Sequence, residues 1–121
     1  MPTIAVIGAS ADRRKYGNRC VRAYARLGYM VYPIHPRETE IEGFPVFTSL
    51  RNVPVESVDL VSVYLPAEIC LSILPDFQSK TIGEVWFNPG ADASAVLQKA
   101  RELGLNIRQG CSIIAVGPMP E

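Results

Sequence analysis

Apolar residues along the chain gather in short runs that polar segments separate. Five of these runs are rich in β-branched or aromatic residues, and each predicts a β-strand. They cover residues 3–8, 29–34, 58–65, 83–87 and 105–110, and a shorter strand is predicted near Val46. Nearly unbroken apolar runs of this kind are typical of strands buried on both faces, as in a parallel sheet.

Helices are predicted where apolar residues recur about one turn apart. Residues 18–27 show this spacing and precede Gly28, which suits the left-handed position that closes a helix. A later helix is expected to begin at Asp92, as its N-cap, and to end before Gly104. The segment 111–117 is apolar, and its pattern assigns it to no element.

A further helix is expected between these two. Pro66 suits the first turn of a helix, and Ile69, Ile73 and Phe77 would form its inner face. Pro75 lies inside this pattern, where proline interrupts a helix, so this helix should be short or kinked.

Strands and helices thus alternate along the chain. This order predicts an α/β fold: a doubly wound, mostly parallel sheet of five to six strands with helices on both faces. We expect one domain over residues 1–117 and a flexible tail over residues 118–121. In such sheets ligands bind beyond the carboxyl ends of the strands, at the point where strand order reverses.

Composition narrows the function classes. The 121 residues suit one domain, and 12 basic against 12 acidic residues argue against a nucleic-acid-binding surface. There is no long apolar run and no signal segment, so we expect a cytoplasmic protein away from the membrane. Three separated cysteines and one histidine predict free thiols in a reducing compartment and no zinc site.

The segment VIGASADRRKYGN, from Val6, carries the strongest chemical signal. Gly8 allows the backbone to approach a ligand closely, Ala9 and Ser10 are small, and Gly17 stands near a helix start with its unpaired N–H groups. Three cations lie just before that helix: Arg13, Arg14 and Lys15. Together these features suit a diphosphate, and the alternative is an ordinary solvated loop.

The type of phosphate ligand follows from two details. The dinucleotide fingerprint would place glycines at positions 8, 10 and 13, but Ser10 and Arg13 stand at the last two, and no P-loop motif is present. The second strand ends with His35 and Arg37, which suit an additional phosphate on a ribose. NADP and coenzyme A both carry one, whereas Glu38 could still serve an unphosphorylated ribose.

Catalytic groups are sparse. No acidic residue is spaced to pair with His35, which we interpret as a ligand contact or a surface residue. Cys111 follows Gly110 on a loop at the ligand side of the sheet and is either a reactive thiol or a small core residue. Tyr64 and Trp86 are expected in the core. We assign no catalytic residue and no metal ligand.

The order of these loops resembles one family, the small single-domain CoA-binding proteins, which are similar to the N-terminal domain of the succinyl-CoA synthetase α-subunit. The resemblance covers nearly the whole chain and rests on six segments: VIGAS (6–10), GYMVYPIHPR (28–37), GFPVFTSL (43–50), DLVSVYLPAE (59–68), VWFNPGA (85–91) and GLNIRQGCS (104–112).

The resemblance implies a Rossmann-like domain that binds coenzyme A, and it assigns residues to parts of that ligand. Those at the diphosphate would be Gly8, Ala9 and Ser10, joined by Lys15, Tyr16 and Gly17 at the helix start. Those at the adenosine end and its 3′-phosphate would be Pro33, His35 and Arg37, with Leu65 and Pro66 over the adenine or ribose. Those along the pantetheine arm would be Asn88, Pro89 and Gly90.

Two segments depart from the family pattern. The first loop carries ADRRKYG where relatives have prolines and a Ser-Tyr pair, so Tyr16 matches that tyrosine only approximately. The end carries QGCSIIAVG where many relatives have Asp-Arg-Cys. In the synthetase the phosphorylated histidine lies in a second domain.

We therefore predict a module that binds CoA or acyl-CoA and has no catalytic machinery of its own. It would act as a homo-oligomer or beside a partner subunit. The alternatives are an NADP-binding regulatory or redox domain, the CoA-binding part of a multi-subunit acyl-CoA ligase, and a ligand-free interaction domain. From sequence alone, Gly8→Val is expected to abolish binding and leave the fold intact.

Overall fold

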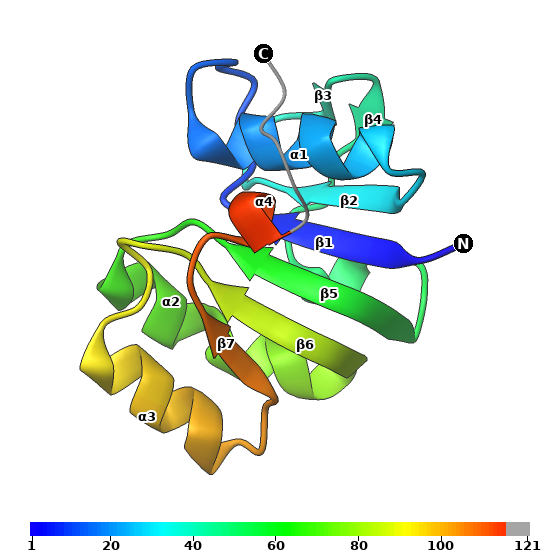
Figure 1. Ribbon diagram of the computed structural model, residues 1–121. Helices are drawn as coiled ribbons and strands as arrows, with labels where there is room; N and C mark the ends of the chain where they lie inside the picture. The colour runs from blue at the N-terminus through cyan, green and yellow to red at the C-terminus, as the bar shows by residue number, and fades with distance from the viewer. Residues whose placement is uncertain (116–121) are drawn as a thin grey trace.

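The computed structural model describes residues 1–115, and a five-stranded parallel sheet forms its centre (Figure 1). The strand order is β2-β1-β5-β6-β7, which is the flavodoxin-like order 2-1-3-4-5 when the five strands are counted along the chain. The strands are β1 (Thr3–Ile7), β2 (Met30–Ile34), β5 (Ser57–Val63), β6 (Thr81–Phe87) and β7 (Ile107–Gln109). The predicted parallel sheet is confirmed.

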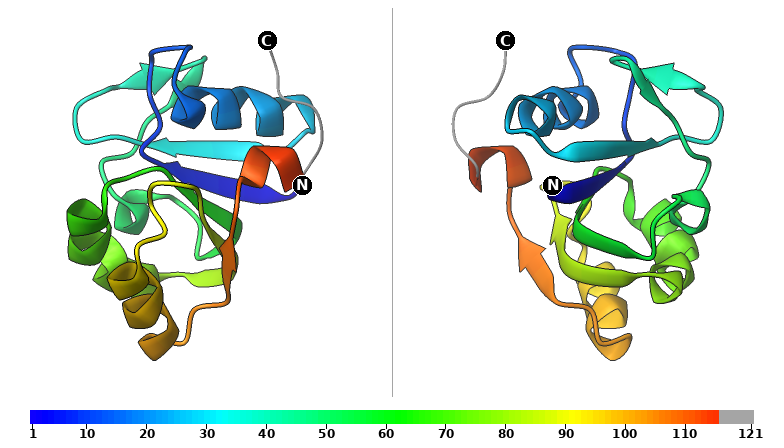
Figure 2. Two further views of the ribbon diagram at one scale, coloured as in Figure 1. Left: turned by 60° about the vertical axis from the view of Figure 1, so that its left-hand side comes forward. Right: turned by 90° about the vertical axis from the view of Figure 1, so that its right-hand side faces the viewer.

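Helices cover both faces of this sheet, as predicted (Figures 1 and 2). On one face α1 (Tyr16–Arg26) lies beside the short α4 (Ser112–Ala115). On the other face α2 (Ala67–Ile73) packs against α3 (Ser94–Glu102), and the 3₁₀ helices η1 (Leu50–Asn52) and η2 (Leu74–Ser79) pack together. Strand order reverses between β1 and β5, because β1 leads through α1 to β2 on one side and later strands are added on the other.

Each face has its own apolar core. The face under α1 buries Val6, Cys20, Val21 and Tyr24 almost completely. The opposite face buries a larger set, which includes Val61, Val63, Val85 and Phe87 from the two central strands. Alternate residues of β1 and β5 serve opposite cores, which explains why these strands are nearly all apolar in sequence.

β2, which contains Pro33, lies at the edge of the sheet, a position that tolerates proline. Pro33 pairs with Val6 of β1 in the parallel register. Its missing N–H requires no partner because β2 has a strand neighbour on one side only. Its carbonyl oxygen accepts a hydrogen bond of 3.0 Å from the N–H of Phe47.

The single strand predicted near Val46 is wrong in detail. The segment instead forms a hairpin of two short strands, β3 (Glu40–Ile41) and β4 (Phe44–Pro45). Its turn holds Glu42 at φ 50° and Gly43 at φ 83°. Two consecutive positive φ values are the mark of a two-residue hairpin turn, and glutamate gives little sequence signal for one.

The inner face predicted for α2 is right only in part. Phe77 is buried as predicted, but Ile69 is 47% exposed, and Cys70 and Leu74 are buried in addition. The chain changes from α2 to the 3₁₀ helix η2 just before Pro75, which confirms the predicted interruption. The tighter 3₁₀ winding rotates the later residues, so one continuous helical spacing cannot describe both pieces.

The last third of the chain brings further corrections. The N-cap of α3 is Ala93, not Asp92, whose carboxylate instead accepts a hydrogen bond from the N–H of Gly90. The helix ends before Gly104 at φ 78°, as predicted. The apolar segment after Gly110 begins with a helix, α4. The predicted domain end at residue 117 and the tail over 118–121 lie outside the described residues.

A network of buried hydrogen bonds connects α4 to the sheet. The amide of Asn88, after β6, donates to the Ser62 hydroxyl (2.9 Å) and to the Val63 carbonyl (2.9 Å). Its Oδ1 accepts from the backbone N–H of Ser112 (2.8 Å), and the Ser112 carbonyl accepts from the Tyr24 hydroxyl (2.9 Å). Asn88 therefore joins β5 and β6 to α4, which Tyr24 links to α1.

Removing this amide should destabilise the domain. Asn88→Ala leaves several buried polar groups without partners, and we expect a loss of about 2–4 kcal/mol in the free energy of unfolding. Urea denaturation measures it, with Asn106→Ala as control, since the exposed Asn106 side chain bonds only near the surface. Equal stability of the two variants would contradict this role of Asn88.

Candidate functional site

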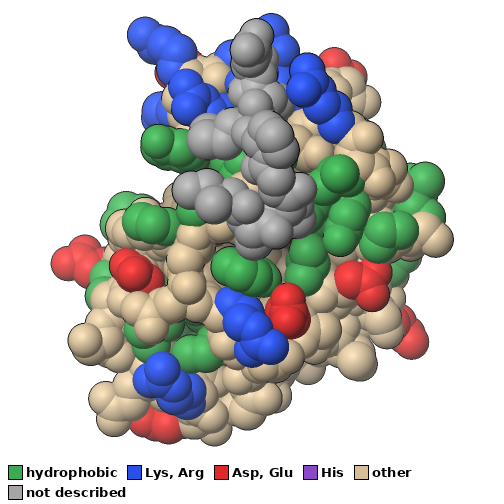
Figure 3. All heavy atoms as spheres, in the orientation of Figure 1, with side chains coloured by type: hydrophobic (Ala, Val, Ile, Leu, Met, Phe, Trp, Pro, Cys, Tyr) green, Lys and Arg blue, Asp and Glu red, His purple; other side chains and the backbone are tan. Residues whose placement is uncertain are grey.

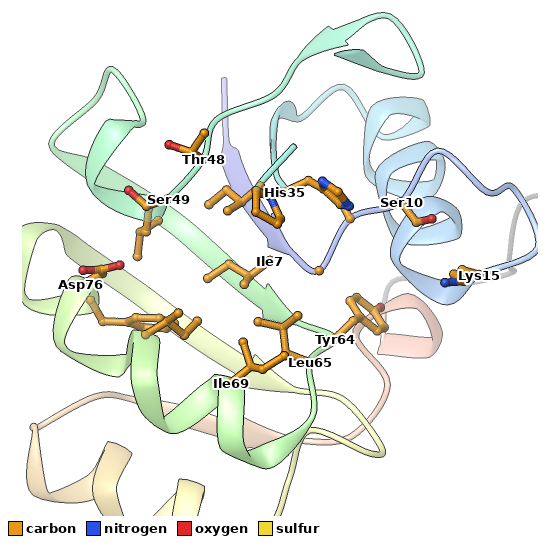
Figure 4. Close-up of a pocket in the computed structure, with 17 residues that line it drawn as sticks. Ile7, Ser10, Lys15, His35, Thr48, Ser49, Tyr64, Leu65, Ile69 and Asp76 are labelled. Carbon is orange, nitrogen blue, oxygen red and sulfur yellow. The ribbon is translucent and has the colours of Figure 1, made fainter. Parts of the chain in front are cut away.

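A cavity of about 440 Å³ opens at the carboxyl ends of β1, β2 and β5, where strand order reverses (Figure 4). Its lining comes from the loop after β1, the end of β2, the segment before η1, the end of β5, and α2 with η2. The lining residues are Ile7, Gly8, Ala9, Ser10, Lys15, Ile34, His35, Pro36, Thr48, Ser49, Leu50, Tyr64, Leu65, Ile69, Ile73, Asp76 and Phe77.

The cavity has two polar ends and an apolar middle. Figure 4 shows Ser10 and Lys15 at one end and Thr48, Ser49 and Asp76 at the other. Between them lie Ile7, Leu65 and Ile69, with His35 on the opposite side of the opening (Figure 4). A long ligand with an anionic group at one point and a flat or apolar group beside it matches this lining.

At Gly8 the backbone that leaves β1 comes very close to the backbone of Tyr64, which follows β5. The φ of Gly8 is +87°, and an added Cβ would collide with the carbonyl group of Tyr64 at the end of β5. Gly17, in the first turn of α1, is equally confined, because its Cβ would collide with the Gly8 carbonyl oxygen. Two glycines therefore let α1 begin directly against the loop that follows β1.

The amino end of α1 is free to face an anion. Its N-cap residue, Lys15, makes no side-chain capping hydrogen bond, and the first turn contains no acidic residue. Within α1 and its N-cap, the positive end of the helix dipole and the first-turn N–H groups therefore have no acidic side chain as a partner.

The three cations of the loop have different environments. Arg13 pairs with Glu42 (Nε to Oε2, 3.4 Å), and Arg14 pairs with Asp12 (Nη2 to Oδ2, 3.0 Å). The hydrogen bonds from Arg14 lower the pKa of the Asp12 carboxyl to about 2. Lys15 alone of the three lines the cavity, and within residues 1–115 it forms no salt bridge.

The loop is fixed from the side opposite the cavity. Asn18 is fully buried, and its amide donates to the Ser10 carbonyl (2.9 Å) and to the Glu42 carboxylate (3.1 Å). The Ser10 hydroxyl accepts from the N–H of Asp12 (3.0 Å). The β3–β4 hairpin, through Glu42, thus holds both the loop and Arg13. Figure 3 shows Lys and Arg side chains gathered over α1 and this loop.

His35 lines the cavity in a defined orientation. Its Nδ1 accepts hydrogen bonds from the backbone N–H groups of Arg37 and Glu38, each 3.0 Å long. The neutral imidazole therefore carries its hydrogen on Nε2, the atom left to donate to a ligand. Arg37 itself is exposed beyond the cavity rim.

The structure brings together six of the fourteen residues proposed from the sequence. Those that line the cavity are Gly8, Ala9, Ser10, Lys15, His35 and Leu65. Those outside its lining are Tyr16, Gly17, Pro33, Arg37, Pro66, Asn88, Pro89 and Gly90. Asn88 is nearly fully buried, with its amide committed to the network around Ser112. The contact of these outer residues with a ligand stays a prediction.

Sequence reasoning missed the far side of the cavity. Thr48, Ser49 and Asp76 belong to segments that carried no chemical motif. Ile69 and Ile73 were expected in the core but face the cavity, which accounts for the exposure of Ile69. Two isoleucines one turn apart on a helix look the same in sequence whether they face a core or a ligand.

The three cysteines and Tyr64 lie in or against the two apolar cores. All three cysteines are free, as predicted, and burial raises the pKa of the Cys20 thiol. Cys111 is half-buried against the core under α1. Tyr64, expected in the core, packs against the core under α1 and also lines the cavity, and its hydroxyl lies 3.2 Å from the Ser112 hydroxyl. No cluster of three or more potential metal ligands occurs among residues 1–115.

Comparison with known proteins identifies the family. The family described as "CoA binding domain" matches residues 2–117. The chain belongs to this CoA-binding domain family. The resemblance stated from the sequence is thereby confirmed, and the cavity is a candidate coenzyme A site. Within residues 1–115 of this CoA-binding domain, no helix combines the length and apolarity needed to cross a membrane.

Curated relatives of the domain are longer proteins. An ADP-forming acetate–CoA ligase I of Archaeoglobus fulgidus is 30% identical over 118 residues, which are 95% of this chain and 17% of the relative. The α-subunit of an ADP-forming acetate–CoA ligase II of Pyrococcus furiosus is 34% identical over 80 residues, or 65% of this chain and 17% of that subunit. The CoA-binding domain thus spans about a sixth of their length.

Solved structures include proteins of nearly the same size. A conserved hypothetical protein of Pyrococcus furiosus superposes with a TM-score of 0.84 at 26% identity, covering 95% of this chain and 99% of that one. A Thermus thermophilus protein gives 0.85 at 27% identity, covering 93% and 86%. The architecture therefore occurs both as a small chain and within larger ligases.

The packing around Gly8 changes one expectation from the sequence. Because a side chain there would meet the Tyr64 backbone, Gly8→Val should damage the fold instead of leaving it intact. Gly8→Ala is expected to cost about 3 kcal/mol or more of stability, from the positive φ and the collision together.

Gly28 supplies the matched control. It also has a positive φ, +85°, but an added Cβ would meet nothing within 4 Å. Gly28→Ala should therefore cost only about 1 kcal/mol, the cost of the backbone conformation alone. Thermal or urea unfolding measures the stability of both variants. Equal losses of stability would show that the close approach of Gly8 to Tyr64 does not add to the cost of a side chain.

Proposed function

We propose that the domain binds coenzyme A or an acyl-CoA in the cavity at the β1–β5 switch, with the diphosphate against Gly8, Ala9 and Ser10. The observation that carries the proposal is the paired close approach of Gly8 and Gly17. It places the uncapped amino end of α1 beside a loop whose backbone a ligand can reach. Such a cradle suits an anion.

The donor set fits the diphosphate. Lys15 supplies a cation at the cavity, and Arg13 and Arg14 are held by acids. Tyr16 and Gly17, which follow Lys15 in the first turn of α1, would offer their N–H groups. We therefore assign the diphosphate contact to Lys15 among the three cations. The missing second and third glycines of the dinucleotide fingerprint disfavour NADP.

The remaining contacts follow from the two directions a ligand can take. Toward β2, the Nε2–H of His35 and the exposed guanidinium of Arg37 would meet the ribose and its 3′-phosphate. Leu65 lines the apolar middle beside Pro66, so these two residues would cover the adenosine. In the other direction, Asn88, Pro89 and Gly90 follow β6 at the same edge of the sheet and would border the pantetheine arm.

A second candidate function is the CoA-binding part of a multi-subunit acyl-CoA ligase. The match to a ligase α-subunit supports it. The chemistry would then require a partner chain, and co-purification with a nucleotide-binding ligase subunit would test this.

Three free cysteines support a reducing, cytoplasmic location.

Isothermal titration calorimetry tests the binding proposal. Coenzyme A should bind saturably and more weakly as salt increases, whereas NADP should bind far more weakly at equal concentration. Lys15→Ala should weaken coenzyme A binding about tenfold or more, as expected for the loss of a charged phosphate contact.

Arg14→Ala is the matched control. This variant also removes one cation from the loop, but the charge of Arg14 is already paired with Asp12. Its affinity for coenzyme A should stay within about twofold of the unmodified domain. Heat with NADP but none with coenzyme A would overturn the proposal. Equal losses in the two variants would overturn the assignment of Lys15.

A further inference from the structure

The polar end of the cavity opposite Lys15 carries groups that the proposed function leaves without a role. Asp76 of η2, together with Thr48 and Ser49 before η1, closes this end (Figure 4). The three residues come from two separate segments that pack together through η1 and η2. A few polar groups at the end of an apolar cavity typically fix the orientation of a bound ligand.

Asp76 is held in one orientation. Its Oδ1 accepts a hydrogen bond of 2.7 Å from the Nε of Arg51 in η1, and its side chain is 26% exposed. Oδ2 accepts no hydrogen bond from any of residues 1–115. One carboxylate oxygen thus fixes the group and the other stays available as an acceptor at the cavity.

Hydroxyl groups beside Asp76 can supply a donor. The Thr48 Oγ1 accepts a hydrogen bond of 2.6 Å from the Asn52 amide, so its own hydrogen stays available. The Ser49 hydroxyl has no partner among the described side chains. This end of the cavity therefore presents a fixed acceptor, from Asp76, and hydroxyl donors from the segment before η1.

The end of the cavity at Asp76 lies away from Gly8, where the diphosphate is proposed to bind. This placement decides which part of coenzyme A would reach Asp76. In coenzyme A the ribose lies between the diphosphate and the base. With the diphosphate at Gly8 and the ribose near His35, the base continues across Leu65 and Ile69 toward Asp76 (Figure 4). These apolar side chains suit the flat faces of a purine.

We infer that Asp76, oriented by Arg51, reads the amino group of the adenine, and that it makes the site selective for 6-aminopurines. Adenine presents an N6 amino donor beside the N1 acceptor, which complements a carboxylate oxygen beside a hydroxyl. A 6-oxopurine presents the reverse pattern, so its O6 would face the carboxylate oxygen. This inference rests on the proposed binding of coenzyme A.

Calorimetry with two ligands tests the inference: coenzyme A, and coenzyme A in which the adenine has been deaminated to hypoxanthine. The unmodified domain should bind the deaminated ligand about tenfold or more less tightly, as expected for a lost hydrogen bond to a charged group. In Asp76→Asn the side-chain amide can accept or donate, so the ratio of the two affinities should fall below about threefold.

Two controls separate this from a general loss of binding. Glu102→Gln makes the same type of change on the exposed face of α3 and should keep the unmodified ratio. Lys15→Ala should weaken both ligands and leave their ratio unchanged, because it acts at the diphosphate. Equal binding of the two ligands by the unmodified domain, or an unchanged ratio in Asp76→Asn, would overturn the inference while the proposed function stands. Absence of coenzyme A binding would overturn both.

Discussion

The structure depends on one close approach of backbone to backbone at the carboxyl end of the sheet. The chain leaves β1 at Gly8 directly beside the carbonyl of Tyr64, and α1 begins with Gly17 against the carbonyl of Gly8. No side chain fits at either contact. The same two glycines bring the amino end of α1 against the loop after β1, which lines the cavity, so fold and candidate site share one constraint.

That constraint explains how much the sequence could predict. The apolar runs identified every strand of the main sheet, because strands buried on both faces allow few polar residues. The loop after β1 was equally visible, since Gly8 and the helix start at Gly17 carry a local signal. The family resemblance then indicated coenzyme A, whereas the basic end of the second strand, at His35 and Arg37, suited both NADP and coenzyme A.

The remaining errors have a common physical origin. Asp76 faces the cavity from η2, where the chain has changed to 3₁₀ winding, and helical spacing alone does not show this rotation. Ile69 faces the cavity from α2, where its spacing in the sequence looks the same as that of a core residue. The resemblance implied a ligand contact for Asn88, and that contact stays a prediction. The part that no local pattern could reveal is its structural role, because its amide connects Ser62 to Ser112, a partner far along the chain. Local patterns predict elements, whereas tertiary contacts decide which side chains meet the ligand.

The central claim is that coenzyme A lies across the β1–β5 switch with its diphosphate at the amino end of α1. Backbone amide NMR shifts, followed during a coenzyme A titration, test it most directly. The largest shifts are expected at Gly8, Ser10 and Gly17, smaller ones near Leu65, and none at the opposite end of the sheet around Met30. Shifts that concentrate at that opposite end, with Gly8 and Gly17 unmoved, would contradict it.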